Sequence, residues 1–315
     1  MDYLSQLSHI LFDAILFFRY SPLNMRFPHF IVPLFVGFSL SAPVDAAAIF
    51  AQGVTEQSGW YDTNKTWNDD NNMCWAAATS NILQWWQDKG TYVPAGTPNG
   101  KIPGDPTQSV ILQNFRDNWG DVGGSAELGF RWYLGGGQFT TTPNGLNDPN
   151  SGKYWEDYIK SIGYDQTPTD PFQKYLPVIQ HNHSYTPNFA SGFVTTMIDL
   201  FKGGAGVTLG ILSGSSGHAI TLWGIDYDQN NNLTALYITD SDDGTTEIKR
   251  IEASIMQTEA AEDNGDKIFL TGYGNGSYFI NHYTALSLPF AIPEPSSVLL
   301  SLLGGSLLCL SRRRR

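Results

Sequence analysis

The chain of 315 residues contains only two cysteines, Cys74 and Cys309. Cys309 lies in a C-terminal apolar run, so residues 49–292 hold a single thiol and cannot form an internal disulfide. A small scaffold held by disulfides is therefore excluded, and this region must be stabilised by a hydrophobic core. It is long enough for one domain with a substantial core, and it contains all nine tryptophans of the chain.

The N-terminal part of the chain has the pattern of a secretory signal peptide. Residues 27–44 form an apolar run behind Arg26, and the small residues Ala46, Ala47 and Ala48 follow. A first transmembrane helix is the alternative interpretation. We expect residues 1–48 to be a leader that is separate from the folded domain.

The C-terminal part has three features in a fixed order. Pro293-Glu294-Pro295 is followed by a second apolar run and then by four arginines at residues 312–315, which is typical of a membrane stop with its basic end inside. This order resembles the PEP-CTERM sorting signal of Gram-negative bacteria. The resemblance implies export to the cell envelope or the extracellular space, with residues 293–315 processed by an exosortase-type enzyme. An ordinary membrane anchor is the alternative.

Net charge limits the partners of the central domain. The formal net charge of the chain is −12, although its C-terminus is basic. An acidic domain of this kind does not favour nucleic acid or an anionic membrane surface. We expect contact with a membrane only through the terminal segments.

The central domain is expected to begin with helices and to end with strands. Cys74 would lie in the first turn of a helix over residues 74–90, and this order predicts an α+β fold in which that helix packs on a mainly antiparallel sheet. Residues 91–153 read as mostly loop apart from one short helix, and residues 154–190 are ambiguous. The other expected helices cover residues 108–119 and 193–204, and the expected strands cover residues 207–212, 218–226, 233–240, 246–251, 267–273 and 278–288.

Two of these strands predict a catalytic pair. If residues 218–226 and 233–240 form a hairpin centred near Gln229, then His218 faces Asp240 and Leu222 faces Leu236. Directly opposed residues have Cβ atoms about 4.5–5.5 Å apart. The hairpin would therefore bring a carboxylate to an imidazole at the end of the sheet.

A thiol at a helix N-terminus has a lowered pKa, because the positive end of the helix dipole favours the thiolate. Cys74 would then be a nucleophile, His218 its base and Asp240 the group that orients the imidazole. The order of these residues along the chain is that of papain-like peptidases. Cys74 could instead be a buried packing residue.

Alternatives remain for the other roles. His282 is a second candidate base, and Asp242 or Asp243 could replace Asp240 as the acid. The pair His181 and His183 lacks further metal ligands, so we expect no metal there. Residues 226–230 resemble the start of a calcium loop but lack its glycine and its closing glutamate, so we interpret them as a hairpin turn.

Two blocks, residues 58–90 and 203–245, resemble the immunoglobulin-degrading cysteine endopeptidases of the IdeS/Mac family. The resemblance rests on Gly59–Asp62, Asn64–Thr66, Cys74 with Ala76-Ala77, Trp85-Trp86, His218, Leu222–Gly224 and Thr239–Asp242. It implies a papain-like fold and endoproteolytic cleavage. It also implies roles for five residues: Cys74 as nucleophile, His218 as base, Asp240 as orienting acid, Lys65 as a contributor to the oxyanion hole, and Asp242 as a supporting residue behind them.

The chain departs from this family in two places. Residues 91–202 show no match, and Trp75 follows the cysteine where the family tends to a small residue. The sorting tail points to an envelope or biofilm setting, which argues against an antibody as the substrate.

Our hypothesis from the sequence is an exported cysteine endopeptidase that cleaves proteins or peptides through a thioester, without a cofactor. The alternatives are a papain-like amidase or transglutaminase-type acyl transferase, and a non-catalytic binding protein of the envelope or matrix.

Overall fold

The computed structural model describes residues 47–135, 152–165, 174–175, 178–182, 189–256, 266–274 and 276–290. The chain divides into two units, residues 1–43 and 44–315, and every described residue belongs to the second. Nearly all of the predicted leader and the whole sorting segment lie outside the described residues, although strand β1 (Ala47–Phe50) begins inside the predicted leader. Within the described part of the chain, no helix is both long and apolar enough to cross a membrane.

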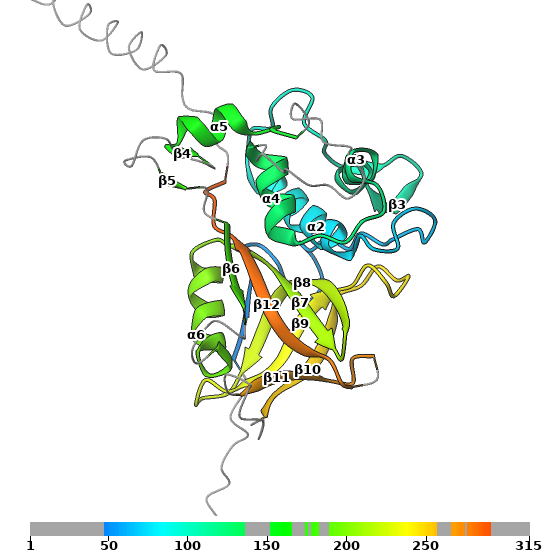
Figure 1. Ribbon diagram of the computed structural model, residues 1–315. Helices are drawn as coiled ribbons and strands as arrows, with labels where there is room; N and C mark the ends of the chain where they lie inside the picture. The colour runs from blue at the N-terminus through cyan, green and yellow to red at the C-terminus, as the bar shows by residue number, and fades with distance from the viewer. Residues whose placement is uncertain are drawn as a thin grey trace, which may run out of the picture. The chain divides into compact units, whose positions relative to one another are not determined.

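The core of the fold is a barrel of antiparallel strands (Figure 1). Its six strands are β7 (Gly206–Ser213), β8 (Ser216–Tyr227), β9 (Leu233–Thr239), β10 (Lys249–Met256), β11 (Lys267–Thr271) and β12 (Phe279–Leu286). The barrel closes because β8 pairs with both β7 and β9, and β12 pairs with both β11 and β7. Two further strands extend the sheet: β1 pairs with β8, and β6 (Val178–Asn182) pairs with β12. All six strands that the sequence predicts are present, with β10 shifted towards the C-terminus.

The register of the β8–β9 hairpin differs from the prediction. Leu222 pairs with Ile238 and not with Leu236, and the ladder is irregular between Leu222 and Gly224. The predicted register is therefore wrong by two residues at Thr221 and Leu222, and by three residues from Gly224 to Asp226. Because side chains alternate with a period of two, the error of two residues at the end of the hairpin that carries His218 leaves the side chains there on their expected face.

Helix α2 (Cys74–Lys89) is buried almost all round, from Trp75 to Gln87. It lies against β7 and β8 on one side and against helices α3 (Val110–Trp119) and α4 (Ala126–Gly135) on the other (Figure 1). Its contact with the barrel includes a polar pair, in which Asn81 Nδ2 donates to Thr221 Oγ1 at 3.0 Å. A helix enclosed on all sides lacks a polar face, which explains why its apolar period is weak. It ends at Lys89, with Gly90 as the predicted stop.

The structure adds elements that the sequence did not predict. The short helix over residues 108–119 is confirmed as α3, but the prediction for residues 91–153 missed a second helix, α4. The ambiguous segment contributes β6 and the helix α5 (Glu156–Ser161). Helix α6 (Phe189–Lys202) begins four residues before its predicted start and ends before Gly203. The remaining short strands are β2 (Lys101–Ile102), β3 (Asp105–Ser109), β4 (Tyr164–Asp165) and β5 (Lys174–Tyr175).

Candidate active site

Cys74 is the first residue of α2 and is partly buried. The N-cap is Met73, which makes no side-chain capping bond. No acidic residue lies in the first turn of the helix. The positive end of the helix dipole therefore acts on the thiol without an opposing carboxylate in that turn, which favours the thiolate.

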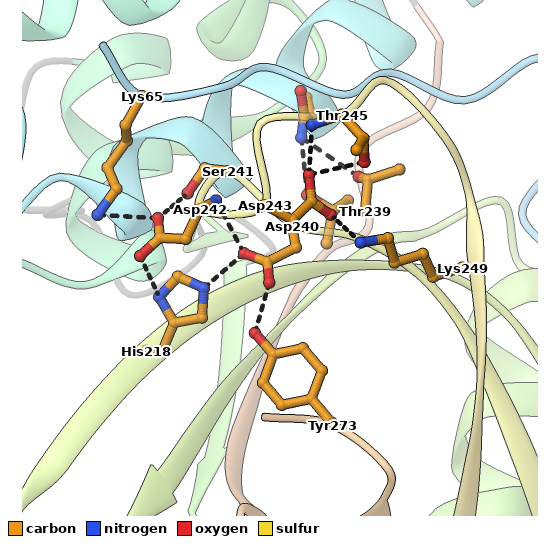
Figure 2. Close-up of polar contacts among 12 residues, drawn as sticks. Lys65, His218, Thr239, Asp240, Ser241, Asp242, Asp243, Thr245, Lys249 and Tyr273 are labelled. Carbon is orange, nitrogen blue, oxygen red and sulfur yellow. Dashed lines mark hydrogen bonds and ion pairs between the residues drawn. The ribbon is translucent and has the colours of Figure 1, made fainter. Parts of the chain in front are cut away.

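His218 lies near the start of β8 and contacts both other members of the predicted triad. Its Nε2 atom is 2.7 Å from Asp240 Oδ1 (Figure 2), and its imidazole is a hydrogen-bond partner of the Cys74 thiol. Since Nε2 is engaged by Asp240, Nδ1 is the nitrogen left for the thiol. The Nδ1 atom also lies 3.7 Å from Asp242 Oδ2. The fold thus brings Cys74, His218 and Asp240 together, as the sequence predicts.

Asp240 directly follows β9 and accepts hydrogen bonds from three sides. Besides His218, its Oδ1 atom accepts from the backbone N–H of Asp242 at 3.1 Å, and its Oδ2 atom accepts from the Tyr273 hydroxyl at 2.6 Å (Figure 2). These bonds fix the carboxylate and, through it, the imidazole ring.

Lys65 comes from the loop between β1 and α2 and reaches the same site. Its Nζ atom lies 2.8 Å from Asp242 Oδ1 (Figure 2). It also donates to the carbonyl oxygen of Asn71 at 2.8 Å. Its side chain is only 2% exposed. The backbone N–H of Lys65 donates to the Ser241 carbonyl at 2.9 Å, which ties this loop to the segment that carries Asp240 and Asp242.

The charges around Cys74 favour an ion pair. Burial alone would raise the pKa of the thiol, but hydrogen bonding to His218, the positive charge of His218, the Ala219 N–H and Lys65 hold that pKa below its ordinary value. Burial would lower the pKa of His218, but hydrogen bonds with Asp240 and Cys74 raise it to about 10. Burial would raise the pKa of Asp240, yet its bonds to His218 and Tyr273 lower it. The arrangement therefore favours a thiolate beside an imidazolium.

A cavity of about 330 Å³ opens beside these groups. Its lining includes Lys65, Cys74, His218 and Asp242, so all four face one space. The helical side of the wall is formed by Asn71, Asn72, Trp75 and Gly123–Ala126, and the barrel side by Thr208–Leu212, Gly217, Ala219 and His282.

His282, the second candidate base, lies in this cavity but not in the triad. It pairs with Gly210 next to a bulge in β12, and a Cβ added to Gly210 would lie 2.0 Å from the imidazole. The ring therefore fills the space over that glycine. Its ring nitrogen Nδ1 lies 3.2 Å from Asn281 Nδ2. Burial lowers the pKa of His282, so this imidazole is neutral at a pH at which the His218 imidazole is charged.

His218, Asp240 and Asp242 could in principle also hold a cation, since one ligand atom from each lies within 4.8 Å of the others. Asp242, however, already pairs with the Lys65 ammonium, whose positive charge opposes a metal ion at this place. The bonds that are present fit the ion pair better than a metal site. His181 stacks on Tyr283 with ring centroids 5.0 Å apart, and His183 lies outside the described residues.

Two contributors to the site were not predicted from the sequence. Tyr273 is visible in hindsight, because β9 and β11 run in the same direction and so end at the same end of the barrel. Trp75 is 2% exposed, and its indole N–H donates to the Val122 carbonyl at 2.9 Å. A Cβ on Gly124 would lie 2.6 Å from the Trp75 ring, so this indole shapes the loop that lines the cavity.

Comparisons with known proteins match the same parts of the chain. The Mac 1 family model matches residues 43–94 and 187–264, which contain Lys65, Cys74, His218, Asp240 and Asp242, and a PEP-CTERM protein-sorting motif matches residues 291–315. A curated relative, the IgM protease of Streptococcus suis (strain P1/7), is 26% identical over 207 residues, which cover 60% of this chain. The aligned region spans only 18% of that relative's length.

Proposed function

Since the chain carries a Mac-1 (IdeS/Mac) family domain and a PEP-CTERM sorting motif, we propose that it is an exported cysteine endopeptidase of the cell envelope. The family and the named relative both support a peptidase. The sorting motif implies export and processing by an exosortase-type enzyme. The observation that carries the proposal is the hydrogen-bonded set of Cys74, His218 and Asp240 beside a cavity.

We assign the papain-like fold on the same grounds. A cysteine at the start of a buried helix faces a histidine on an antiparallel barrel, and the cavity lies between the two. Such a peptidase requires this arrangement. Helices form one side of the cleft and a barrel forms the other, and the two catalytic groups lie on opposite walls.

The proposed reaction begins with the thiolate of Cys74. Its sulfur attacks the carbonyl carbon of the scissile peptide bond, and the carbonyl oxygen becomes an oxyanion. The His218 imidazolium gives its proton to the leaving amine as the C–N bond breaks, which leaves a thioester on Cys74. His218 then takes a proton from water, the hydroxide attacks the thioester, and the thiolate and the acid product are released.

Lys65 is the proposed side-chain donor to the oxyanion. Lys65 lines the cavity together with Cys74. In the first turn of α2, the N–H groups of Ala76 and Ala77 already donate to the Met73 carbonyl, so a further backbone donor would come from the start of the helix before them. Removal of one such donor costs about 10²–10³-fold in kcat in comparable sites. Asp242 would keep the ammonium in place, since it is the paired carboxylate.

The substrate is proposed to be a protein or a peptide. Immunoglobulins are the substrate class that the name of the relative suggests, so IgM belongs in any test. The sorting motif places the enzyme in the envelope, where other proteins are equally accessible to it.

The test uses the full chain, purified in detergent micelles and incubated with a panel of proteins that includes IgM, IgG and casein. We expect cleavage fragments in mass spectrometry that Cys74→Ala abolishes and the matched Cys309→Ala variant retains. Equal cleavage by the Cys74→Ala variant would refute the proposal. Incorporation of a primary amine without peptide cleavage would favour an acyl transferase, and an unreactive thiol with no turnover would favour a binding protein.

A further inference from the structure

Residues 65–70, called here the Lys65 loop, are arranged around one buried carboxylate. Asp70 is fully buried, and its Oδ2 atom accepts from the Thr66 N–H at 2.8 Å and from the Thr66 hydroxyl at 3.1 Å. Its Oδ1 atom accepts from the Trp67 N–H at 2.7 Å. The carboxylate thus binds the backbone of the two residues that directly follow Lys65.

Arg116 of α3 balances the charge of this carboxylate. Its Nη1 atom lies 2.9 Å from Asp70 Oδ2 and donates to the Thr66 hydroxyl at 3.2 Å. Its Nη2 atom donates to the side-chain oxygens of Gln108 and Gln113. The Lys65 loop is therefore fastened to α3, although the two are distant in sequence.

The Lys65 loop has an unusual backbone at Trp67. This residue has a φ of 63°, a region that bulky side chains rarely adopt. Such conformations persist only where the surroundings enforce them, and they gather at functional sites. Trp67 is 52% exposed, and its ring centroid lies 4.1 Å from Lys65 Nζ. The strained residue therefore covers the ammonium of the neighbouring lysine.

We propose that Asp70, with Arg116, is a positioning residue that holds the Lys65 loop and thereby keeps the Lys65 ammonium in the cleft beside Cys74 and Asp242. Asp70 does not line the cavity and does not reach the reacting atoms; it acts through the backbone of Thr66 and Trp67. Its effect on turnover rests on the proposed peptidase function. The placement of Lys65 does not, and it can be measured without a substrate.

Two readouts follow from the placement of the ammonium. The ε-methylene protons of Lys65 lie close to the Trp67 ring and are expected to show a ring-current shift in spectra of the full chain labelled with ¹³C-lysine. Lys65 also contributes to the lowered pKa of Cys74, so its displacement slows alkylation by iodoacetamide in neutral and acidic buffer. The alkylation is measured in a Cys309→Ala background, where Cys74 is the sole thiol.

The test compares Asp70→Asn with Asp226→Asn as the matched control. Asp226 is also a buried carboxylate paired with an arginine, since its Oδ2 atom lies 2.8 Å from Arg250 Nε, but it belongs to no part of the proposed site. Both variants remove a buried charge from an ion pair. If Asp70→Asn does not fold, Asp70→Asn/Arg116→Gln removes both charges together and takes its place.

We expect Asp70→Asn to abolish the Lys65 ring-current shift and to slow alkylation of Cys74 by about tenfold at pH values below the pKa of the thiol, where the rate follows the thiolate fraction. Asp226→Asn should change neither. Adding Asp70→Asn to Lys65→Met should slow alkylation no further than Lys65→Met alone. A folded Asp70→Asn variant with an unchanged Lys65 signal would overturn the inference. If the wild-type protein cleaves no substrate but Asp70→Asn still abolishes the Lys65 ring-current shift, the inference stands and only the proposed peptidase function is refuted.

Discussion

Asp240 is held by donors from three segments of the chain: His218 on β8, the Asp242 backbone, and Tyr273 after β11. A carboxylate fixed in this way holds the imidazole ring in one orientation, which a triad requires. The third donor is the one that no sequence motif indicates. It offers a direct test of how far the orientation of Asp240 matters.

We predict that Tyr273→Phe lowers kcat/KM by about tenfold, because a hydrogen bond to a charged group contributes about 1.5–3 kcal/mol. The change removes one hydroxyl and leaves the ring in place. Tyr278→Phe is the matched control, since its ring packs on Tyr273 with centroids 5.3 Å apart without a bond to Asp240. Equal rates for Tyr273→Phe and the wild type would show that two donors suffice.

Asp62 gives a prediction about pH and stability. Burial, with the negative charges of Asp243 and Asp240, raises the pKa of Asp62 to about 8, and its Oδ1 atom has no hydrogen-bond partner among the described residues. The folded protein therefore keeps a proton that the unfolded chain releases near pH 4, so the free energy of unfolding falls as pH rises from about 4 to 8.

Asp62→Asn removes this titration, because the amide stays neutral. We expect its melting temperature to exceed that of the wild type at pH 9, and the difference to shrink or reverse at pH 5. Thermal melts at both pH values check this. A constant difference between the two proteins across pH would contradict the assignment of a raised pKa.

At the scale of elements, one wall of the cavity is formed where β7 pairs with the bulged strand β12. Gly210 of β7 and His282 of β12 pair directly, and only a glycine leaves room for the imidazole. The bulge sits next to His282, between β7 and β12. This wall of the cavity therefore requires glycine at position 210, because a Cβ atom there would clash with the His282 ring.

Gly210→Ala should force the His282 ring away from its position, because the added Cβ would lie 2.0 Å from it. We expect substrate cleavage to fall by at least about tenfold while alkylation of Cys74 keeps its rate, since the His218 pair is untouched. The double variant Gly210→Ala/His282→Ala should cleave as His282→Ala alone does. Gly192→Ala in α6, where an added Cβ meets nothing within 4 Å, is the control. Loss of alkylation in Gly210→Ala would contradict this account.

Much of the element order could be predicted from the sequence. All six barrel strands were expected from the sequence, and the order of helices before strands indicated an α+β fold. Helix α4 was missed because its glycines, Gly129 and Gly135, resemble loop residues, whereas Gly129 in fact packs against Thr79 and Trp75. The hairpin register was wrong because an irregularity in a ladder leaves no mark in the pattern of residues.

The residues of the candidate site were predictable to a different degree. Cys74 was indicated because it is the single cysteine of residues 49–292. His218 and Asp240 were indicated by their places on a hairpin, and the register error of two residues at that end left both side chains on the predicted face of the sheet. The residues that hold the site, Tyr273 and Asp70, come from segments whose approach depends on the whole fold. No local pattern could indicate them.

At the scale of the whole molecule, α2 separates the site from residues 288–290, the last described part of the chain. Cys74 is at one end of the helix, and Trp86, about 18 Å along it, donates its indole N–H to the carbonyls of Leu288 and Pro289. The Trp85 ring packs on Phe290, the last described residue, with centroids 5.4 Å apart. The last described residues therefore lie at the end of α2 away from the nucleophile.

The central claim is that Cys74 and His218 form a thiolate–imidazolium pair. The most direct measurement is the rate of Cys74 alkylation by iodoacetamide between pH 4 and 9, in the Cys309→Ala protein and in its His218→Ala variant. We predict fast labelling well below pH 7 that collapses in the His218→Ala variant, because the pKa of the thiol is lowered and that of His218 is raised. Slow labelling in both proteins that rises only near the ordinary thiol pKa of about 8.5 would contradict the account.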